Sequence, residues 1–232
     1  MKTVLVTGGV RGIGLAVCEA FLQKGYRVCA CYSKDKTAAE TAAEKGIETY
    51  LADVSREGDV TALFGAVGKV DVLVNNAGVS LYKQIQDVTE EEIDRLFAVN
   101  VKGAMLCARE AARQMISRGE GVILQISSVW GEVGGSLESV YSASKAALIG
   151  FTKALAKELG YSGVRVNCIS PGVIDTAMNA QFSREDIAAL KDETPVGRLG
   201  VGKDVADAAI YLAEATFVTG VDLPVNGGFS IV

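Results

Sequence analysis

The sequence predicts an α/β fold: a single Rossmann-like domain with a doubly wound parallel sheet of about seven strands and helices on both faces. Short β-branched runs alternate with helical stretches, and these runs are almost continuously apolar. Such runs are typical of parallel strands that are covered on both faces. Short links between strands and helices imply right-handed crossovers. No linker, repeat or low-complexity segment interrupts the chain, so we expect one domain over residues 1–232.

Each expected strand is a short run rich in Val, Ile, Leu or Thr; in chain order the strands are 3–7, 26–32, 47–54, 70–78, 121–127, 164–170 and 220–228. Each expected helix is a stretch rich in Ala, Glu, Leu or Lys; in chain order the helices are 14–25, 37–46, 55–68, 89–118, 139–159, 183–191 and 205–215. Gly25 ends the first helix, because glycine favours helix C-termini. Thr89 and Glu92 form a Thr-x-x-Glu capping box, which predicts the start of the long helix 89–118.

The segment 171–202 has little periodicity apart from its short helix, and it holds two of the three prolines. In doubly wound folds, long excursions beyond the carboxyl end of a strand often cover the substrate. We therefore expect a substrate lid here; the alternative is an ordinary surface connection.

The composition limits the partners and the compartment. The net charge of −5 disfavours nucleic acid or an anionic membrane as the main partner, although it allows a local basic patch. The apolar run at the N-terminus is too short for a signal peptide or a membrane span, so we expect a soluble, cytoplasmic protein.

The five cysteines are scattered, and the chain has no histidine. They show no metal-ligand spacing, so we expect no metal site. Cys29 and Cys31 share one face of a strand. We interpret all five as reduced core thiols, as in a cytosolic protein.

A glycine-rich turn, VTGGVRGIG at 6–14, follows the first strand and opens the first helix. Gly8, Gly12 and Gly14 permit a tight turn and the close approach of a phosphate, and the helix N-terminus offers free N–H groups. Strand and helix stand on both sides as this motif requires, so the turn predicts dinucleotide binding.

The spacing T-G-x-x-x-G-x-G resembles the fingerprint of the short-chain dehydrogenase/reductase family. Further stretches resemble the family's motifs in order along essentially the whole chain: NNAG at 75–78, NVKG with Asn100, Ser128 with YSASK at 141–145, and SPGVIDT at 170–176. By this resemblance, Asp53 hydrogen-bonds the adenine amine, and Thr176 fixes the nicotinamide carboxamide together with the backbone of Ile174. From the residues alone, Asp53 is also a candidate helix N-cap and 75–78 a simple turn.

The end of the second strand, where the adenosine ribose should lie, decides between NAD and NADP. An NAD enzyme usually carries an acid there. Here Tyr32, Ser33 and Lys34 occupy the place, and Arg11 adds a second cation from the glycine turn. Two cations and a hydroxyl favour a 2′-phosphate, so we expect NADPH rather than NADH. The alternative is that both cations are solvated surface charges, and Asp35 lies close enough to count against the preference.

Together the glycine turn, the ribose end and the family resemblance predict cofactor contacts at Gly8, Arg11, Gly12, Ile13, Gly14, Tyr32, Ser33, Lys34, Asp53, Val54, Asn76, Ala77, Gly78, Tyr141, Lys145, Pro171, Gly172, Ile174 and Thr176.

Tyr141 and Lys145 are the best acid–base candidates in a chain without histidine. They lie at i and i+4 of a helix and so share a face. An ammonium nearby, aided by an oxidised nicotinamide, would lower the phenol pKa toward neutrality, where acid–base catalysis is efficient. Ser128 precedes Tyr141 by thirteen residues, which matches the family spacing, and on that spacing we prefer it to Ser127.

The resemblance implies four catalytic roles. Ser128 bonds the substrate carbonyl, Tyr141 donates the proton, Lys145 holds the ribose and lowers the tyrosine pKa, and Asn100 steadies a relay water. The residues alone leave another role open for Asn100, which is to satisfy backbone groups in a kinked helix.

Two further resemblances suggest which substrate the chain acts on. The chain is similar to 3-oxoacyl-[acyl-carrier-protein] reductases, for which Arg113, Arg118 and Arg165 are candidate docking cations, although the turn at 160–163 has none. The loop 127–145 resembles bacterial elongation factor P 5-aminopentanone reductases, with Trp130 as an apolar or cation–π wall and Glu132 or Glu138 as the partner of an amine. A packed loop tryptophan and two solvated glutamates are the alternatives.

Three hypotheses follow: a reductase of a protein-borne aminoketone or small aliphatic ketone, a fatty-acid-pathway 3-oxoacyl reductase, and a cofactor-binding scaffold without turnover. Elongation factor P or acyl carrier protein is the expected partner of the first two. Family members are commonly tetramers, so we expect a homotetramer, with a dimer as alternative. Alanine-rich helix faces permit subunit contact, and the tail 229–232 is a candidate for another contact.

Overall fold

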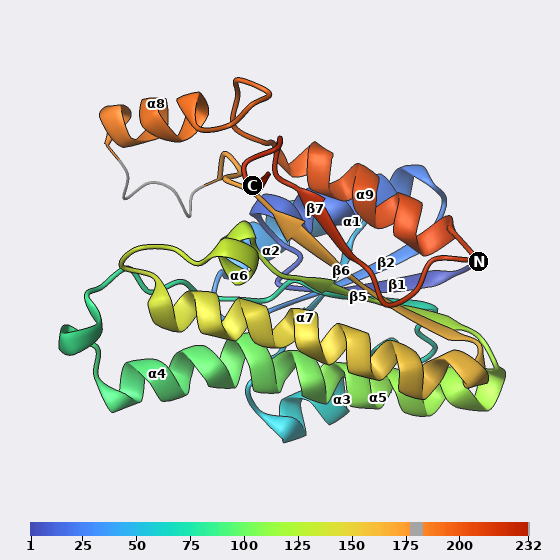
Figure 1. Ribbon diagram of the computed structural model, residues 1–232. Helices are drawn as coiled ribbons and strands as arrows, with labels where there is room; N and C mark the ends of the chain where they lie inside the picture. Colours follow the sequence, from blue (N-terminus) through green and yellow to red (C-terminus); the bar gives the residue numbers. More distant parts are fainter. Residues whose placement is uncertain (177–182, 232) are drawn as a thin grey trace.

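The chain folds around a parallel sheet, shown in Figure 1, and the computed structural model describes residues 1–176 and 183–231. Within these residues seven strands lie in the order β3-β2-β1-β4-β5-β6-β7, and every neighbouring pair is parallel. The strand order reverses between β1 and β4. In such sheets ligands bind beyond the carboxyl ends of the strands at this switch point. The predicted fold class is confirmed.

The strands are β1 Thr3–Thr7, β2 Arg27–Tyr32, β3 Glu48–Leu51, β4 Val72–Asn75, β5 Gly121–Ile126, β6 Val164–Pro171 and β7 Asp222–Val225. The helices are α1 Gly12–Gln23, α2 Lys36–Glu44, α3 Glu57–Val67, α4 Glu90–Phe97, α5 Ala104–Arg118, α6 Val129–Val133, α7 Ser139–Leu159, α8 Arg184–Asp192 and α9 Gly202–Glu214. Shorter helical segments are η1 Ile85–Asp87, η2 Ala98–Gly103 and η3 Gly160–Ser162.

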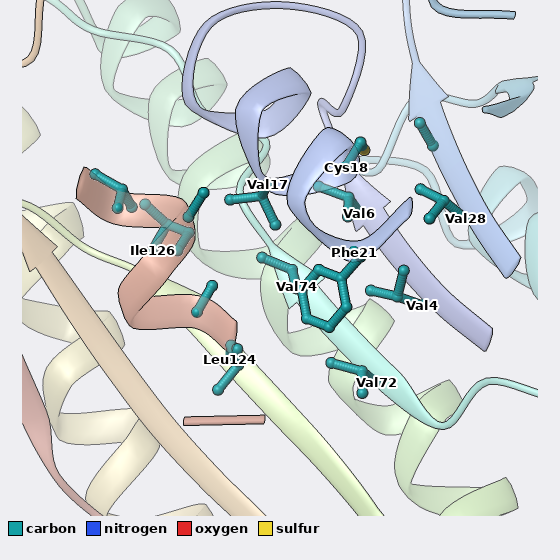
Figure 2. Close-up of a cluster of buried hydrophobic side chains, with 14 of the residues drawn as sticks. Val4, Val6, Val17, Cys18, Phe21, Val28, Val72, Val74, Leu124 and Ile126 are labelled. Carbon is teal, nitrogen blue, oxygen red and sulfur yellow. The ribbon is translucent and has the colours of Figure 1, made fainter. Parts of the chain in front are cut away.

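Two helical layers cover the sheet (Figure 1), and each encloses its own core. On one face α1, α2 and α9 pack on the sheet; Figure 2 shows Phe21 of α1 lying among Val4, Val28 and Val72 of three strands. On the other face α3, α5 and α7 form the second core. Burial on both faces explains why the strands are almost continuously apolar.

The long helix expected at 89–118 is interrupted. It begins with the predicted capping box, in which Thr89 and Glu92 bond each other's backbone N–H groups. Between α4 and α5 the turn widens to a π-helix over Ala98–Gly103. Such bulges insert an extra residue into a helix and often mark functional sites.

The region expected to form a lid contains helix α8, close to the predicted 183–191, and Figure 1 shows it standing apart from the sheet. Residues 177–182 of the expected lid lie outside the described residues. Before and after them, Ile174 pairs with Gly200, and the Asp175 N–H donates to the Gly200 carbonyl at 2.8 Å. The two ends of the region are thus fastened together.

All five cysteines are buried and unpaired. Cys29 and Cys31 both face the core beneath α3 and α5, so the predicted shared face is confirmed. Among the described helices, none combines the length and apolarity that a bilayer crossing requires.

Candidate active site

Ser128, Tyr141 and Lys145 meet at the carboxyl ends of β5 and β6. Ser128 follows β5 and caps α6, because its hydroxyl accepts a hydrogen bond from the Trp130 N–H at 3.2 Å. The hydroxyls of Ser128 and Tyr141 are hydrogen-bonded. Ser127 faces away from this group and donates to the Lys145 carbonyl at 2.9 Å.

Helix α7 spans the predicted 139–159, so Tyr141 and Lys145 share a face one turn apart. The Lys145 Nζ lies 5.6 Å from the centroid of the Tyr141 ring and donates to the Ile126 carbonyl at 2.8 Å. Both side chains are buried. The ammonium therefore lies between the phenol and the end of β5.

Burial shifts the pKa values of both Tyr141 and Lys145. Burial raises the pKa of Tyr141, and the nearby Glu138 charge raises it further, whereas the hydrogen bond with Ser128 lowers it. Burial lowers the pKa of Lys145 to about 8. Burial therefore dominates the pKa of Tyr141 in the chain without a cofactor, and acidification by Lys145 together with an oxidised nicotinamide stays a prediction.

Asn100 lies in the π-helical segment and is almost fully buried. Its Oδ1 accepts from the Val79 N–H at 2.8 Å, and its Nδ2 donates to the Val79 carbonyl and to the Ser144 hydroxyl, at 2.9 and 3.1 Å. Both N–H donors are thus committed to the protein. From its place in the π-helical turn, the Asn100 side chain satisfies the backbone N–H and carbonyl of Val79, and it thereby holds the loop after 75–78. This is close to the alternative role that the sequence left open for Asn100.

The glycine turn is locked against the 75–78 turn. Asn76 Nδ2 donates to the carbonyls of Thr7 and Gly8, both at 3.0 Å. A Cβ on Gly14 would lie 2.3 Å from the Gly8 carbonyl oxygen, and one on Gly8 would lie 3.0 Å from Ala77. Only glycine allows this close packing.

The N-terminus of α1 meets the requirements for an anion. No side chain among the described residues caps it, and its first turn has no acid. Gly12 has a positive φ, and the nearest atoms to a Cβ placed on it are those of Thr176, at 3.6 Å. The residues predicted to hold a dinucleotide are therefore suited to bind its phosphates. Free N–H groups and the positive end of the helix dipole lie here, and the glycines allow a phosphate to approach closely.

The predicted ribose end lies at the carboxyl end of β2. Ser33, Lys34 and Arg11 are exposed, and Tyr32 is half-buried. Asp35, the acid that counted against NADP, caps α2 by accepting from the Ala38 N–H at 3.0 Å. It also lies 3.9 Å from the Arg11 guanidinium. Its carboxylate is therefore directed to the helix and to Arg11.

The N-cap alternative for Asp53 is wrong. The residue that precedes α3 is Arg56, whereas the Asp53 carboxylate accepts from the backbone N–H and hydroxyl of Ser55, at 3.0 and 2.7 Å. A tight turn thus orients Asp53. Of the remaining predicted contacts, Val54 packs on Gly103, and Gly172 on Asn226.

A cleft adjoins the catalytic group, and it is lined by Ile13, Ser80, Ser127, Ser128, Trp130, Glu138, Tyr141, Pro171, Gly172, Val173, Ile174, Thr176 and Leu190. Trp130 packs edge-to-face on Phe229, with ring centroids 5.4 Å apart. Glu138 is 7% exposed, so its interpretation as a solvated glutamate is wrong. Glu132 is not among the residues that line the cleft, and burial raises the pKa of its carboxyl group.

The burial of Glu138 has a chemical consequence. No described residue donates a hydrogen bond to its carboxylate, and burial raises its pKa to about 7. The preceding residue, Leu137, has φ +63°, which is strained for a non-glycine residue. A strained turn therefore directs an unpaired acid into the cleft.

Four residues of the site were not predicted from the sequence. Three line the cleft, namely Ser80, Val173 and Leu190, and the fourth, Phe229, packs on Trp130. Ser80 follows the 75–78 turn, and Leu190 lies on the helix already expected within the lid, so position along the chain gave a signal for both. The sequence suggested the tail 229–232 as a candidate subunit contact, which stays a prediction, and gave no sign that Phe229 packs on Trp130.

Comparison with known proteins identifies relatives along the whole chain. The family model for short chain dehydrogenases matches residues 2–187. The 3-oxoacyl-[acyl-carrier-protein] reductase of Bos taurus is 39% identical over 99% of this chain and 98% of its own. The uncharacterized oxidoreductase YmfI of Bacillus subtilis is 36% identical over 98% of both chains. A crystal structure from Agrobacterium tumefaciens, provisionally named a gluconate dehydrogenase, has a TM-score of 0.95 and 30% identity over 100% of this chain and 96% of its own.

Proposed function

The chain belongs to the short chain dehydrogenase family and is an oxidoreductase, and on this premise we propose that it reduces a ketone to an alcohol with NADPH. We propose further that the ketone carries an amine, as does a 5-aminopentanone group on elongation factor P or a related aliphatic ketone. The buried carboxylate of Glu138, which lies beside Tyr141 and has no hydrogen-bond partner within 1–176 and 183–231, is the observation that carries this assignment.

The cofactor would be held by the uncapped N-terminus of α1, by Asn76 to Gly78, and by Thr176 across from Gly12. When bound, the dinucleotide supplies the hydride. Lys34 after β2 and Arg11 in the glycine turn support NADPH over NADH, because the nearby acid Asp35 is engaged as the cap of α2. The chain provides no free acid among Tyr32, Ser33 and Lys34 to receive ribose hydroxyls.

The chain's own residues handle the proton. Ser128 donates a hydrogen bond to the substrate carbonyl oxygen, and Tyr141 gives its hydroxyl proton to that oxygen as the carbonyl carbon receives the hydride. The buried Lys145 ammonium stabilises the phenolate that remains. Because burial raises the pKa of Tyr141 in the chain without a cofactor, the phenol is there in its protonated form, as a proton donor must be.

The recognition of an amine depends on Glu138 and Trp130. A buried carboxylate without a partner is costly, and an ammonium group of the substrate would remove that cost. Trp130 offers an aromatic face in the same cleft, and such faces attract cations. The strain at Leu137 supports a functional reason for the inward direction of Glu138.

A second candidate is reduction of 3-oxoacyl groups on an acyl carrier protein, and the name of the Bos taurus relative favours it. The surroundings of the three arginines predicted to dock an acyl carrier protein count against this function. Arg165 donates to the carbonyls of Leu212, Ala213 and Val218, and Arg118 donates to that of Val70. Arg113 pairs with Glu110. Each of these three arginines therefore has a partner within the chain.

We infer a homotetramer, with a dimer as alternative, in the cytoplasm. Ile93, Met105 and Ile116 expose apolar side chains along α4 and α5, which supports a subunit contact there. The buried free thiols support a reducing compartment.

A panel of ketones tests the proposal. The wild-type chain and Glu138→Gln are assayed with NADPH and with NADH on an aminoketone, its uncharged methyl analogue and an acetoacetyl thioester. We expect NADPH to be preferred, and the aminoketone to be preferred by the wild-type chain alone. A preference for the thioester that Glu138→Gln leaves unchanged would transfer the assignment to the second candidate. Binding of NADPH without turnover of any ketone would indicate a non-catalytic scaffold.

A further inference from the structure

The C-terminal tail, residues 226–231, lies against the loop that carries Ser128. Figure 1 shows the end of the chain next to α6. The contact is the edge-to-face pair of Trp130 and Phe229, with an interplanar angle of 85°. The tail thus packs on the short helix α6 through one aromatic pair.

The tail has a defined internal structure. Asn226 accepts from the Gly228 N–H at 3.0 Å and donates through Nδ2 to the Ser230 hydroxyl at 2.7 Å. The Phe229 N–H donates to the Asn226 carbonyl at 3.2 Å. Gly227 and Gly228 both have positive φ, which glycine adopts at no steric cost. These bonds fix the direction of the Phe229 ring.

The other side of the tail is fastened to the segment that follows α8. The Val196 N–H donates to the Gly227 carbonyl at 3.1 Å. A Cβ on Gly227 would lie 2.7 Å from Thr194, and one on Gly228 would lie 3.0 Å from Pro195. The tail therefore joins the segment 194–196 to α6, which carries the cleft residue Trp130.

Trp130 is held between two surfaces. On one side is the Phe229 ring, and on the other is Gly135, where an added Cβ would lie 3.1 Å from the indole. An aromatic ring confined in this way has few orientations, and Trp130 forms part of the cleft wall. Its orientation decides the shape of the cleft beside Glu138.

We propose that Phe229 is a positioning residue that holds Trp130 as a wall of the substrate cleft, so that the C-terminal tail sets the discrimination between long and short ketones. This inference rests on the proposed ketone reductase function. Phe229 does not line the cleft, and so it acts through Trp130 rather than by touching the substrate.

The test exploits the fact that Trp130 is the only tryptophan of the chain. Phe229→Leu removes the ring and keeps an apolar side chain, Phe229→Tyr keeps the ring, and Gly135→Ala disturbs Trp130 from its other side. Phe217→Leu is the matched control, because Phe217 is fully exposed. For each variant we measure tryptophan emission and acrylamide quenching without substrate, the melting temperature, NADPH affinity, and kcat and KM for a short and a long ketone.

We expect Phe229→Leu and Gly135→Ala to raise acrylamide quenching and to raise KM for the long ketone by about three- to tenfold, the range for loss of an aromatic pair. The kcat, the NADPH affinity and the KM for the short ketone should stay within about twofold of wild type. Phe229→Tyr should restore the wild-type values, and Phe217→Leu should not depart from them.

Two outcomes would overturn the inference. Unchanged emission and quenching in Phe229→Leu would show that the ring does not hold Trp130. A uniform loss of NADPH binding, kcat and thermal stability would show that the tail merely stabilises the fold. If the wild-type chain reduces no ketone, the proposed function fails, whereas the emission and quenching measurements still report whether Phe229 orients Trp130.

Discussion

The two sides of the cleft are built in different ways. On the cofactor side, the Asn76 side chain ties residues 75–78 to the backbone carbonyls of Thr7 and Gly8, and the glycines leave no room for a Cβ. On the substrate side, Tyr141 of α7 interacts with Ser128, and Phe229 of the C-terminal tail packs on Trp130. Close packing of the backbone thus defines the first side, and contacts between distant side chains define the second.

This difference predicts different responses to mutation. A backbone-defined site is damaged by the smallest added side chain, whereas a site made of side chains changes its selectivity before it loses its fold. Substitutions on the two sides should therefore separate binding, chemistry and selectivity.

The largest effect is expected at Tyr141, where the two sides meet. Tyr141→Phe removes the acid that protonates the carbonyl oxygen, so kcat should fall by about 10²- to 10⁴-fold. NADPH affinity, measured by calorimetry, should stay near the wild-type value, because the ring remains in place. Turnover that survives in Tyr141→Phe would exclude Tyr141 as the proton donor.

The next effect is expected on the cofactor side. Gly14→Ala places a Cβ 2.3 Å from the Gly8 carbonyl oxygen, so the glycine turn must shift. We expect a loss of about 1–3 kcal/mol in the free energy of unfolding and NADPH affinity at least about tenfold weaker. Gly65→Ala is the control, because nothing lies within 4 Å of its added Cβ, and it should change stability by about 1 kcal/mol or less. Equal behaviour of the two variants would contradict a turn defined by close backbone packing.

A smaller and pH-dependent effect is expected at Glu138. Burial raises its pKa to about 7, so the carboxyl group is neutral below that pH and charged above it. The attraction for an ammonium is therefore present above pH 7 and lost as the pH falls, and kcat/KM for an aminoketone should fall as the pH is lowered through 7 and level off about tenfold lower, where Glu138 is neutral.

Glu138→Gln should abolish this pH dependence and lower kcat/KM for the aminoketone by about tenfold at pH 8. The uncharged analogue serves as the control and should show neither effect. An aminoketone profile that stays the same in Glu138→Gln would remove Glu138 from substrate recognition.

The smallest effect is expected at the exposed ribose end. Arg11→Ala and Lys34→Ala should each raise KM for NADPH by about threefold without changing KM for NADH, because exposed charges contribute little. Added salt should reduce the difference, since it screens such charges. Lys157→Ala, at the far end of α7, is the control. Equal changes with both cofactors would indicate that neither cation recognises the 2′-phosphate.

The same contrast explains what the sequence could predict. The sheet, helix α7 and the glycine turn follow from short-range patterns: apolar runs, i and i+4 spacing, and glycines between a strand and a helix. The π-helical turn at 98–103 could not be predicted, because it depends on Asn100 finding the backbone of Val79, which lies twenty-one residues away in the chain.

On the substrate side, the sequence correctly directed attention to Trp130 and Glu138 as cleft residues, but not to their surroundings. The ring of Phe229 lies ninety-nine residues beyond Trp130, so no local pattern connects them. The burial that raises the pKa of Tyr141 in the chain without a cofactor could not be predicted, because spacing along a helix gives a neighbouring charge but not the extent of burial.

The π-helical turn between α4 and α5 has a consequence for insertions and deletions. Removing one residue from 98–103 would allow an ordinary α-helix to continue from α4 into α5. Since each residue of an α-helix advances by about 100°, the deletion would rotate one helix by that angle relative to the other. Either the apolar side of α4 would swing toward water, or Asn100 would release the Val79 backbone. The length of this short stretch is therefore as strictly constrained as the identity of any residue in it.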